Sequence, residues 1–273
     1  MAFRLSTLNL TGLFGVCAFT CLHAQLTAMP IRQPGATLDT SIRNEADRAA
    51  DQAAAWLISR QRPDGSWGIS NRTVRSTALA LLALQTSPRL TVSRSDACVR
   101  AALYLDRTSR LPLPDLETHA WRLLALAAAL PHDDPERTSC LQRLAHQTEP
   151  ILADAAESPR RFWSEAMSAA GLTNSTPAAY PDDSARLACL ANRWPPEDTP
   201  DHAVLWRCAR LVNRAGKGQL VRGESVLDWR KDLAVRLIRT QRRAPEAGGY
   251  WAASSTHDAC EETAFGMLIL LEL

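Results

Sequence analysis

The stretch "WLISRQRPDGSWG", residues 56–68, indicates where one helix ends and the next begins. Upstream of it, apolar residues recur at the one-face spacing of an α-helix, at Ala46, Ala49, Ala50, Ala53, Leu57 and Ile58. Pro63 cannot continue a helix and Gly65 permits a positive φ, so a turn is expected here. "STALALLALQTS", residues 76–87, then restarts a strongly apolar helix. The stretch therefore predicts a helical hairpin.

The same pattern continues along the chain. "DACVRAALYLDRTS" (96–109) and "LETHAWRLLALAAAL" (116–130) repeat the helix pair. Later helices are expected at the proline-marked starts "DDPE" and "DTPD", where Asp134 or Thr199 can cap and proline takes the first helical position. No stretch alternates with the period of two that a strand requires. The sequence predicts an all-α protein.

The helix pairs resemble one another. "AAAWLISRQ" (53–61) aligns with "AALYLDRTS" (101–109), and "AVRLIRTQRRAPEAGGYW" (234–251) repeats the leucine, the glutamine and a Gly-x-Trp. Gln61 and Gln241 lie 180 residues apart, which accommodates about four periods of helical-hairpin length. We therefore expect about five hairpins, although residues 137–222 follow the pattern poorly.

This motif resembles the repeat of squalene–hopene-type terpene cyclases and protein prenyltransferases. The matching positions are Trp56, Leu57, Gln61, Gly65 and Trp67 in the first copy and Leu237, Gln241, Gly249 and Trp251 in the last. The resemblance implies an α/α toroid, complete or incomplete, with inner and outer rings of helices over residues 44–273. A glutamine can bond backbone groups at the helix end while a tryptophan covers the turn. The motif is thus evidence about architecture rather than activity.

The N-terminus differs from the rest of the chain. Arg4 precedes an apolar stretch from about Leu8 to Leu22, which is short for a membrane span, and Ala24 or Ala28 offers a small residue for cleavage. We expect a signal peptide at residues 1–24 and a polar linker at 25–43, on a protein exported to the periplasm or secreted. The alternative is an uncleaved N-terminal membrane anchor. No transmembrane span is expected after the signal is removed.

Composition excludes several classes of partner. The 273 residues are 46% apolar and 22% charged with a net charge of +2, so a nucleic-acid surface has no electrostatic basis. No glycine-rich phosphate loop follows an apolar run, and no cofactor is expected. The five cysteines beyond the signal show no Cys-x-x-Cys spacing, so a structural zinc knuckle is not expected.

The segment "HDACEETAFG", residues 257–266, holds the strongest candidates for chemistry. It resembles the Asp-x-Asp-Asp-Thr-Ala segment of class II terpene cyclases, which protonates an alkene or epoxide. Aligning on Thr263 places Glu261 on the proton-donating aspartate and Glu262 on its neighbour, but Ala259 falls where the first aspartate belongs. A strong acid needs that cooperating carboxylate. A cyclase-like enzyme using Glu261 is therefore an alternative and not the main prediction.

Zinc binding and a thioester are two further chemistries that the residues of this segment suggest. The prenyltransferase resemblance implies zinc bound by Asp, Cys and His, and two Asp-x-Cys pairs occur: Asp96 with Cys98, and Asp258 with Cys260 after His257. The pattern arises easily by chance, so this is a lesser alternative and no metal is expected. A thioester of the complement type is excluded, because Thr263 stands where the cross-linked glutamine belongs.

The favoured interpretation makes this segment a helix start. Asp258 is expected to be the N-cap with Glu261 three residues on, as in a capping box, and acidic residues in a first turn interact favourably with the helix dipole. The remaining histidines (His119, His132, His146 and His202) show no ligand spacing and are expected to be surface or core residues. The sequence thus predicts a non-catalytic repeat domain that binds a partner protein or an apolar, isoprenoid-like ligand.

Overall fold

A computed structural model describes the chain from residue 38 to 273. It leaves out the short segments 70–71, 89–90, 111–112, 114, 132–133, 153–154, 174–182, 193, 195–200, 216–219, 246 and 255–256. The predicted signal peptide and most of the predicted linker lie outside the described residues. Within those residues, no helix combines the length and the apolar character needed to cross a membrane.

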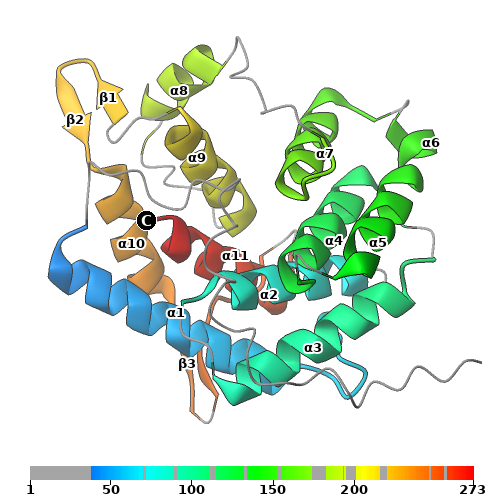
Figure 1. Cartoon of the computed structure of the whole chain (residues 1–273). Helices are drawn as coiled ribbons and strands as arrows, with labels where there is room; N and C mark the ends of the chain where they lie inside the picture. Colours follow the sequence, from blue (N-terminus) through cyan, green and yellow to red (C-terminus); the bar gives the residue numbers. More distant parts are fainter. Residues whose placement is uncertain are drawn as a thin grey trace, which may run out of the picture.

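The described residues are predominantly helical, as predicted (Figure 1). The helices are α1 (Thr40–Arg60), α2 (Thr73–Thr86), α3 (Val92–Arg107), α4 (Leu116–Ala129), α5 (Pro135–His146), α6 (Glu149–Leu152), α7 (Glu157–Ala169), α8 (Asp183–Asn192), α9 (His202–Arg214), α10 (Trp229–Thr240) and α11 (Ala259–Glu272). The strands are β1 (Leu220–Arg222), β2 (Ser225–Leu227), β3 (Arg242–Ala244) and β4 (Gly248–Tyr250).

Aspartate caps start many of these helices. Asp134 caps α5 with proline at the first helical position, as predicted. The expectation for α9 was wrong, because Asp201 and not Thr199 is the N-cap: its side chain accepts the Ala203 amide at 2.8 Å. The predicted linker is also too long. Helix α1 begins at Thr40, since Asp39 accepts a hydrogen bond from the Ser41 amide and caps it there.

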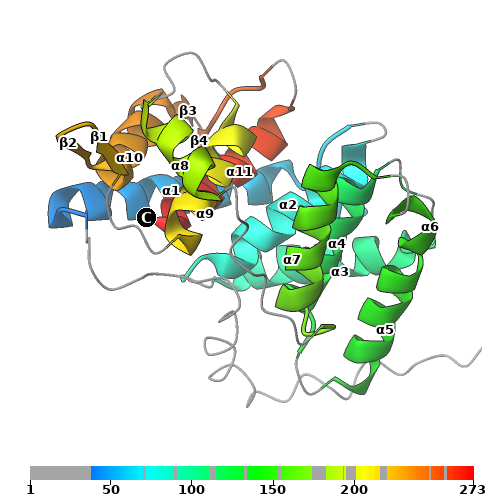
Figure 2. The same cartoon turned by 90° about the horizontal axis from the view of Figure 1, so that it is seen from above.

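The helices lie in two layers (Figures 1 and 2). Helices α9, α11, α2, α4 and α7 form an inner row in which each packs against the next. Helices α10, α1 and α3 form a row outside it, and α5 packs on α4. The hairpins α1–α2 and α10–α11 come from opposite ends of the described chain but pack against each other. Two layers of hairpins are what a toroid requires, while closure of the ring stays a prediction.

The turn between α1 and α2 is held as the motif predicts. Trp67 is fully buried, its amide donates to Thr77 Oγ1 at 3.0 Å, and its indole Nε1 donates to the Leu57 carbonyl at 2.6 Å. Gln61 Nε2 donates to the carbonyl of Ala97 in α3 at 2.8 Å. The tryptophan therefore fastens the turn to its own hairpin, and the glutamine fastens it to the next one.

The turn between α10 and α11 repeats these contacts. The Trp251 amide donates to Thr263 Oγ1 at 3.1 Å, and its Nε1 donates to the Leu237 carbonyl at 3.1 Å. Gln241 Nε2 donates to the carbonyl of Ala49 in α1 at 2.8 Å. The last hairpin is thereby bonded to the first, since the glutamine again reaches the neighbouring outer helix.

The structural equivalent of Gly65 in the last turn is Gly248 and not Gly249, with which the sequence motif aligned it. Gly65 has φ 91°, and an added Cβ would lie 2.3 Å from a carbonyl oxygen of α3. The residue with the same conformation in the last turn is Gly248, with φ 87° and a carbonyl oxygen of α1 at 2.4 Å. Gly249, which the alignment placed opposite Gly65, lies close to a side chain and not to a carbonyl oxygen. A Cβ there would meet the Gln241 side chain at 2.6 Å.

The expectation of no strands was wrong. Strands β1 and β2 pair antiparallel between α9 and α10, and β3 pairs with β4 in the last turn. The last turn has seven residues between its glutamine and Gly249, against three between Gln61 and Gly65, so the extra chain can pair with itself. Tyr250 of β4 then stacks on Trp56 of α1, with ring centroids 5.1 Å apart.

Candidate functional site

The start of α11 carries the predicted cap. Asp258 is the N-cap, and its carboxylate accepts the Glu261 amide at 2.9 Å, which confirms that part of the helix-start interpretation. The interpretation was wrong in treating the glutamates as residues of an ordinary polar first turn. Both Glu261 and Glu262 have 0% exposed surface. Burying carboxylates completely requires partners, because desolvation of a charge is otherwise expensive.

Glu262 is stabilised as a carboxylate. Its Oε2 accepts the backbone amide of His202 at 3.1 Å, at the positive N-terminal end of α9, and also contacts Nδ1 of the same histidine. Burial acts to raise the pKa of Glu262, but hydrogen bonding from His202 and neighbouring side chains outweighs it and lowers the pKa to about 2. Glu262 therefore joins the starts of α9 and α11.

Glu261 lies in a poorer environment for a charge. Its Oε1 accepts a hydrogen bond from Ser76 of α2 at 3.0 Å and lies 3.9 Å from Nε of Arg75. Its Oε2 is buried without a hydrogen-bond partner. Burial raises the pKa of Glu261 above its ordinary value, and Arg75 and Ser76 offset only part of that effect. The two adjacent glutamates thus have opposite pKa shifts.

His257 connects both glutamates to Asp201. Its Nδ1 lies 3.4 Å from Asp201 Oδ1 and 3.5 Å from Glu262 Oε1, and its Nε2 lies 3.9 Å from Glu261 Oε2. Arg75 NH2 lies 3.1 Å from the same Nε2. We call these side chains, with His202 and Ser76, the buried polar cluster. Among the described residues, Asp201, His257 and Glu262 form the group whose ligand atoms lie close enough to hold a metal ion.

The ligand sets implied by the prenyltransferase resemblance are not brought together. Asp96 is exposed while Cys98 is buried on α3. Burial raises the pKa of Cys260 to about 12, which disfavours the thiolate that a metal binds. Of that set only His257 joins the cluster, beside two carboxylates from outside the Asp-x-Cys pattern.

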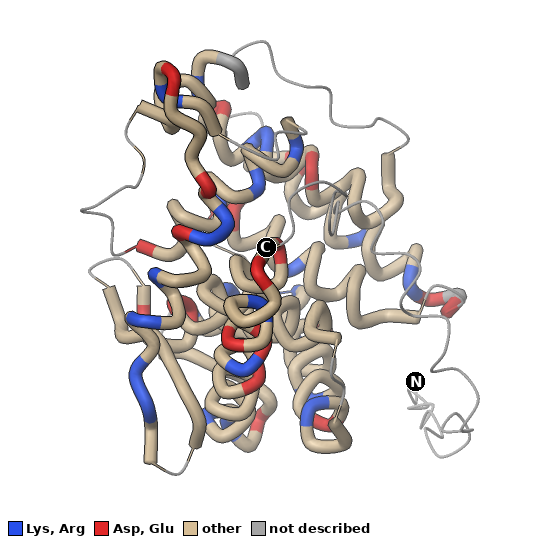
Figure 3. The backbone as a smooth tube through the Cα atoms, turned by 90° about the vertical axis from the view of Figure 1, so that its left-hand side faces the viewer, with Lys and Arg blue, Asp and Glu red and all other residues tan. Residues whose placement is uncertain are grey.

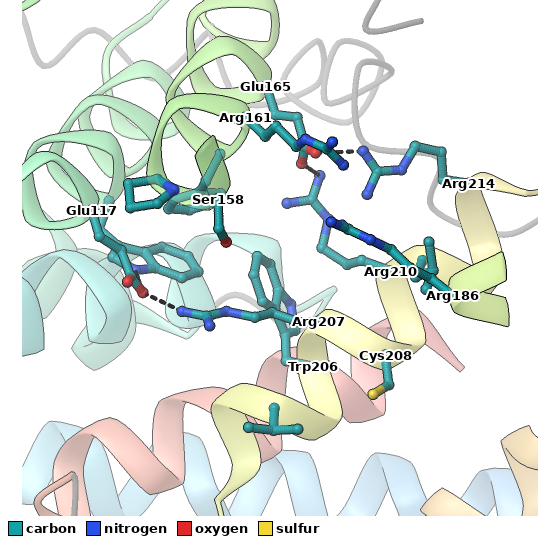
Figure 4. Close-up of a pocket in the computed structure, with 15 residues that line it drawn as sticks. Glu117, Ser158, Arg161, Glu165, Arg186, Trp206, Arg207, Cys208, Arg210 and Arg214 are labelled. Atoms are coloured by element: carbon teal, nitrogen blue, oxygen red, sulfur yellow. Dashed lines mark hydrogen bonds and ion pairs between the residues drawn. The ribbon is translucent and has the colours of Figure 1, made fainter. Parts of the chain in front are cut away.

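A pocket of about 450 Å³ opens beside the cluster, between α4, α7 and α9 (Figure 4). Its aromatic lining is Trp121, Phe162 and Trp206, which pack with ring centroids 4.7 to 6.1 Å apart. Val204 and Leu211 add aliphatic surface. The pocket is large enough for a small organic ligand and is mostly apolar at its base.

Arginines line the pocket beside these aromatic residues, most of them on the side of Glu165 (Figure 4). Five line the pocket, against two glutamates: Arg161, Arg186, Arg207, Arg210 and Arg214 face Glu117 and Glu165. Arg210 and Arg214 both pair with Glu165, so two guanidinium groups share one carboxylate. Among the residues that line the pocket, cationic side chains therefore outnumber anionic ones. Elsewhere charges of both signs are interspersed along the helices, as Figure 3 shows for one face.

The pocket and the buried polar cluster are in contact. Glu117 in the pocket pairs with Arg207 at 2.8 Å and with Arg75 of the cluster at 3.3 Å. Phe265 of α11 packs against Trp121, with centroids 5.6 Å apart, and against His257 at the same separation. A change in one site can thus reach the other through Arg75 and Phe265.

The sequence predicted three members of this region, Glu261, Glu262 and His257, and missed most of the others. Glu261 and Glu262 were candidates, whereas His202 was expected to be an unremarkable histidine. Arg207, Arg210 and Arg214 follow one face of α9 at spacings of three and four, which is a signal of a basic stripe. No local pattern relates that stripe to the aromatic residues of α4 and α7.

Comparison with protein-family models, curated proteins and solved structures found no match to this chain. The resemblance to the cyclase and prenyltransferase repeat therefore rests on the motif residues alone.

Proposed function

We propose that this chain is a non-catalytic helical-repeat protein that binds an apolar ligand with an anionic head group in the pocket between α4, α7 and α9. The observation that carries the proposal is the pairing of an aromatic base with five arginines and two glutamates around one pocket. Aromatic rings accommodate an apolar body, and guanidinium groups bind carboxylate or phosphate through several donors at once. The isoprenoid-like ligand expected from the sequence fits this description if it ends in such a head group.

Two arginines are the best candidates for holding the head group. Arg210 and Arg214 lie one turn apart on α9 and share Glu165, and Arg210 also interacts with the carboxylate of Glu272, so both guanidinium groups are held in place beside the pocket. Arg210 also lies over the Trp206 ring at 4.8 Å, which fixes its guanidinium beside the aromatic base. The head group then lies at the α7–α9 side, with the apolar body against Trp206 and Trp121.

Catalysis by Glu261 is less well supported. The side chain has no exposed surface and is absent from the pocket lining, so a substrate in the pocket does not reach it. A general acid must lie within hydrogen-bond reach of the group it protonates. Arg75 contacts both Glu117, which lines the pocket, and Glu261, which does not, so Glu261 is related to the pocket only through other side chains.

The test compares two ligands that differ in the head group. Farnesyl monophosphate and farnesol are titrated into the protein by calorimetry. We expect the phosphate to bind at least about tenfold more tightly, which corresponds to about 1.4 kcal/mol. The double variant Arg210→Gln, Arg214→Gln should remove that preference and leave farnesol binding unchanged.

A matched control removes the same charge elsewhere. The double variant Arg239→Gln, Arg242→Gln lies on α10 and β3, where both residues are exposed and outside the pocket. It should bind both probes as the wild type does. Equal affinity for the two probes, or no binding of either, would remove the proposed head-group site. Turnover of squalene that disappears in Glu261→Gln would replace binding with catalysis.

The N-terminal pattern supports export as part of the same proposal. Arg4 followed by the apolar stretch up to Leu22 and a small residue at Ala24 or Ala28 has the features of a secretory signal. N-terminal sequencing of protein recovered outside the cytoplasm should give a start near Gln25 or Met29. Recovery of intact Met1 on the cytosolic protein alone contradicts export.

A further inference from the structure

We infer that Asp201, His257 and Glu262 form a binding site for a divalent transition-metal ion of the zinc type. The three ligand atoms come from two elements that meet in the core: the N-cap of α9, and the segment that begins α11. The inference is independent of the proposed ligand pocket, since none of the three residues lines it.

The distances between the ligand atoms fit coordination of one metal ion. His257 Nδ1 lies 3.4 Å from Asp201 Oδ1 and 3.5 Å from Glu262 Oε1. These separations are longer than the usual N–H···O distance of about 2.9 Å. They are close to the separation of about 3.3 Å between two ligands of a tetrahedral zinc ion with bonds of about 2.0–2.1 Å. All three ligand atoms lie within 4.8 Å of one another, so side-chain rearrangement is enough to bring them around one ion.

The local charge also favours a cation. The carboxylates of Asp201, Glu261 and Glu262 lie around His257, and the guanidinium of Arg75 is the cation paired with Glu261 there. With all three carboxylates ionised and the histidines neutral, this group carries two excess negative charges, and the carboxylates of Glu261 and Glu262 are fully buried. A divalent cation neutralises both, and two carboxylates with one imidazole form an accepted zinc ligand set.

The second ring nitrogen of His257, Nε2, lies near a carboxylate oxygen that could accept its proton when Nδ1 binds a metal. A histidine that binds metal through one nitrogen usually donates its other N–H to a carboxylate. His257 Nε2 lies 3.9 Å from Glu261 Oε2, an oxygen that is buried without a hydrogen-bond partner. Arg75 NH2 lies 3.1 Å from Nε2 and can only donate, so in the metal-free arrangement the ring proton is on Nδ1. Metal binding at Nδ1 shifts the ring proton to Nε2. Arg75 then moves off Nε2 and keeps its contact with Glu117, and Glu261 Oε2 becomes the acceptor of the Nε2 proton.

The experiment measures zinc and cobalt binding by the purified protein. Competition with a chromophoric chelator should reveal one tight zinc site per chain. The cobalt derivative should show the ligand-field absorption of a four-coordinate ion, without the charge-transfer band that a thiolate ligand produces. Asp201→Asn should weaken zinc binding at least about tenfold, and Glu262→Gln should do so too. Asn retains the capping oxygen at residue 201, so that variant is expected to fold.

Matched controls use the neighbouring acid and thiol. Asp258→Asn and Cys260→Ser alter the Asp-x-Cys pair and should bind zinc with wild-type affinity. Absence of a stoichiometric zinc site in the wild type would overturn the inference, as would unchanged affinity in Asp201→Asn that retains its helical circular-dichroism spectrum. A thiolate band that disappears in Cys260→Ser would assign the metal to the other ligand set and also overturn it.

Discussion

The α1–α2 and α10–α11 hairpins have the same turn but different chemistry beyond it. In each, the tryptophan amide donates to a threonine of the inner helix and the indole donates to a leucine carbonyl of the outer helix. Thr77 and Thr263 are therefore equivalent positions. Counting back from them, Arg75 of α2 corresponds to Glu261 of α11, and Ser76 corresponds to Glu262.

The equivalent residues also contact one another across the molecule. Both Arg75 and Ser76 contact Glu261, at 3.9 and 3.0 Å. The repeated turn thus fixes where the first turns of the inner helices meet, while the residues placed there are free to differ. One copy supplies donors and the other supplies carboxylates. The repeated scaffold and the variable site can therefore be perturbed separately.

The largest expected effect comes from the shared scaffold. Trp67→Ala and Trp251→Ala should each lower the free energy of unfolding by about 3–5 kcal/mol, since each removes a large, fully buried aromatic side chain. Urea unfolding monitored by circular dichroism measures both. Equal losses support equivalent turns. A variant whose melting temperature equals that of the wild type would make its copy of the motif accidental.

The next largest loss of stability is expected for Glu262, a buried carboxylate that the α10–α11 hairpin has and the α1–α2 hairpin lacks. Glu262→Gln should destabilise by about 1–3 kcal/mol at neutral pH, because it weakens hydrogen bonds to His202 in a fully buried site. The pKa of Glu262 is lowered to about 2 from its ordinary 4.5, so the folded protein binds fewer protons than the unfolded chain. Its contribution to stability is present above about pH 4.5 and is lost as the pH falls toward 2.

Urea unfolding at several pH values tests this assignment. The difference between wild type and Glu262→Gln should shrink steadily between about pH 4.5 and pH 2. Ser76→Ala, at the equivalent position of α2, serves as the comparison and should show no such narrowing in that range. A difference that stays constant from pH 7 to pH 3 would mean that the Glu262 carboxylate is not stabilised by ionisation.

A smaller effect concerns the helix caps. Asp258→Ala should cost about 0.5–2 kcal/mol, because it leaves the Glu261 amide without its 2.9 Å partner. The equivalent residue before α2 is Arg72, whose side chain makes no capping hydrogen bond. Arg72→Ala should therefore cost less than Asp258→Ala in the same unfolding assay. Equal losses would show that the cap is not what distinguishes the two helix starts.

These contrasts indicate how far sequence reasoning reaches here. The turns and the Asp258 cap depend on residues within one hairpin, so spacing alone predicted them. The burial of Glu261 and Glu262 depends on Ser76 and His202, which lie 185 and 60 residues away. The pocket likewise combines α4, α7 and α9. The last two of these helices lie in the middle of the chain, where the repeat motif is not recognisable. Local patterns cannot reveal such a meeting of distant segments without the packing order of the helices.

The smallest expected effect is that of Glu261→Gln, and its sign completes the comparison. Burial raises the pKa of Glu261, so the folded protein binds more protons than the unfolded chain and stability falls as the pH rises through the ordinary value near 4.5. At neutral pH the ionised carboxylate is thus a burden that glutamine removes. We expect Glu261→Gln to change stability by less than about 1 kcal/mol, with any gain larger at pH 7 than at pH 4.

Comparison with Glu262→Gln in the same experiment decides whether adjacent carboxylates act oppositely. Glu261→Gln leaves Arg75 its 3.3 Å contact with Glu117 and keeps an oxygen for Ser76 to donate to, so little else is disturbed. A loss above about 2 kcal/mol at pH 7 would mean that the Arg75–Glu261 pair stabilises the fold despite its burial. The ionised carboxylate would then stabilise the fold at residue 261 as it does at residue 262, and the contrast between the two glutamates would disappear.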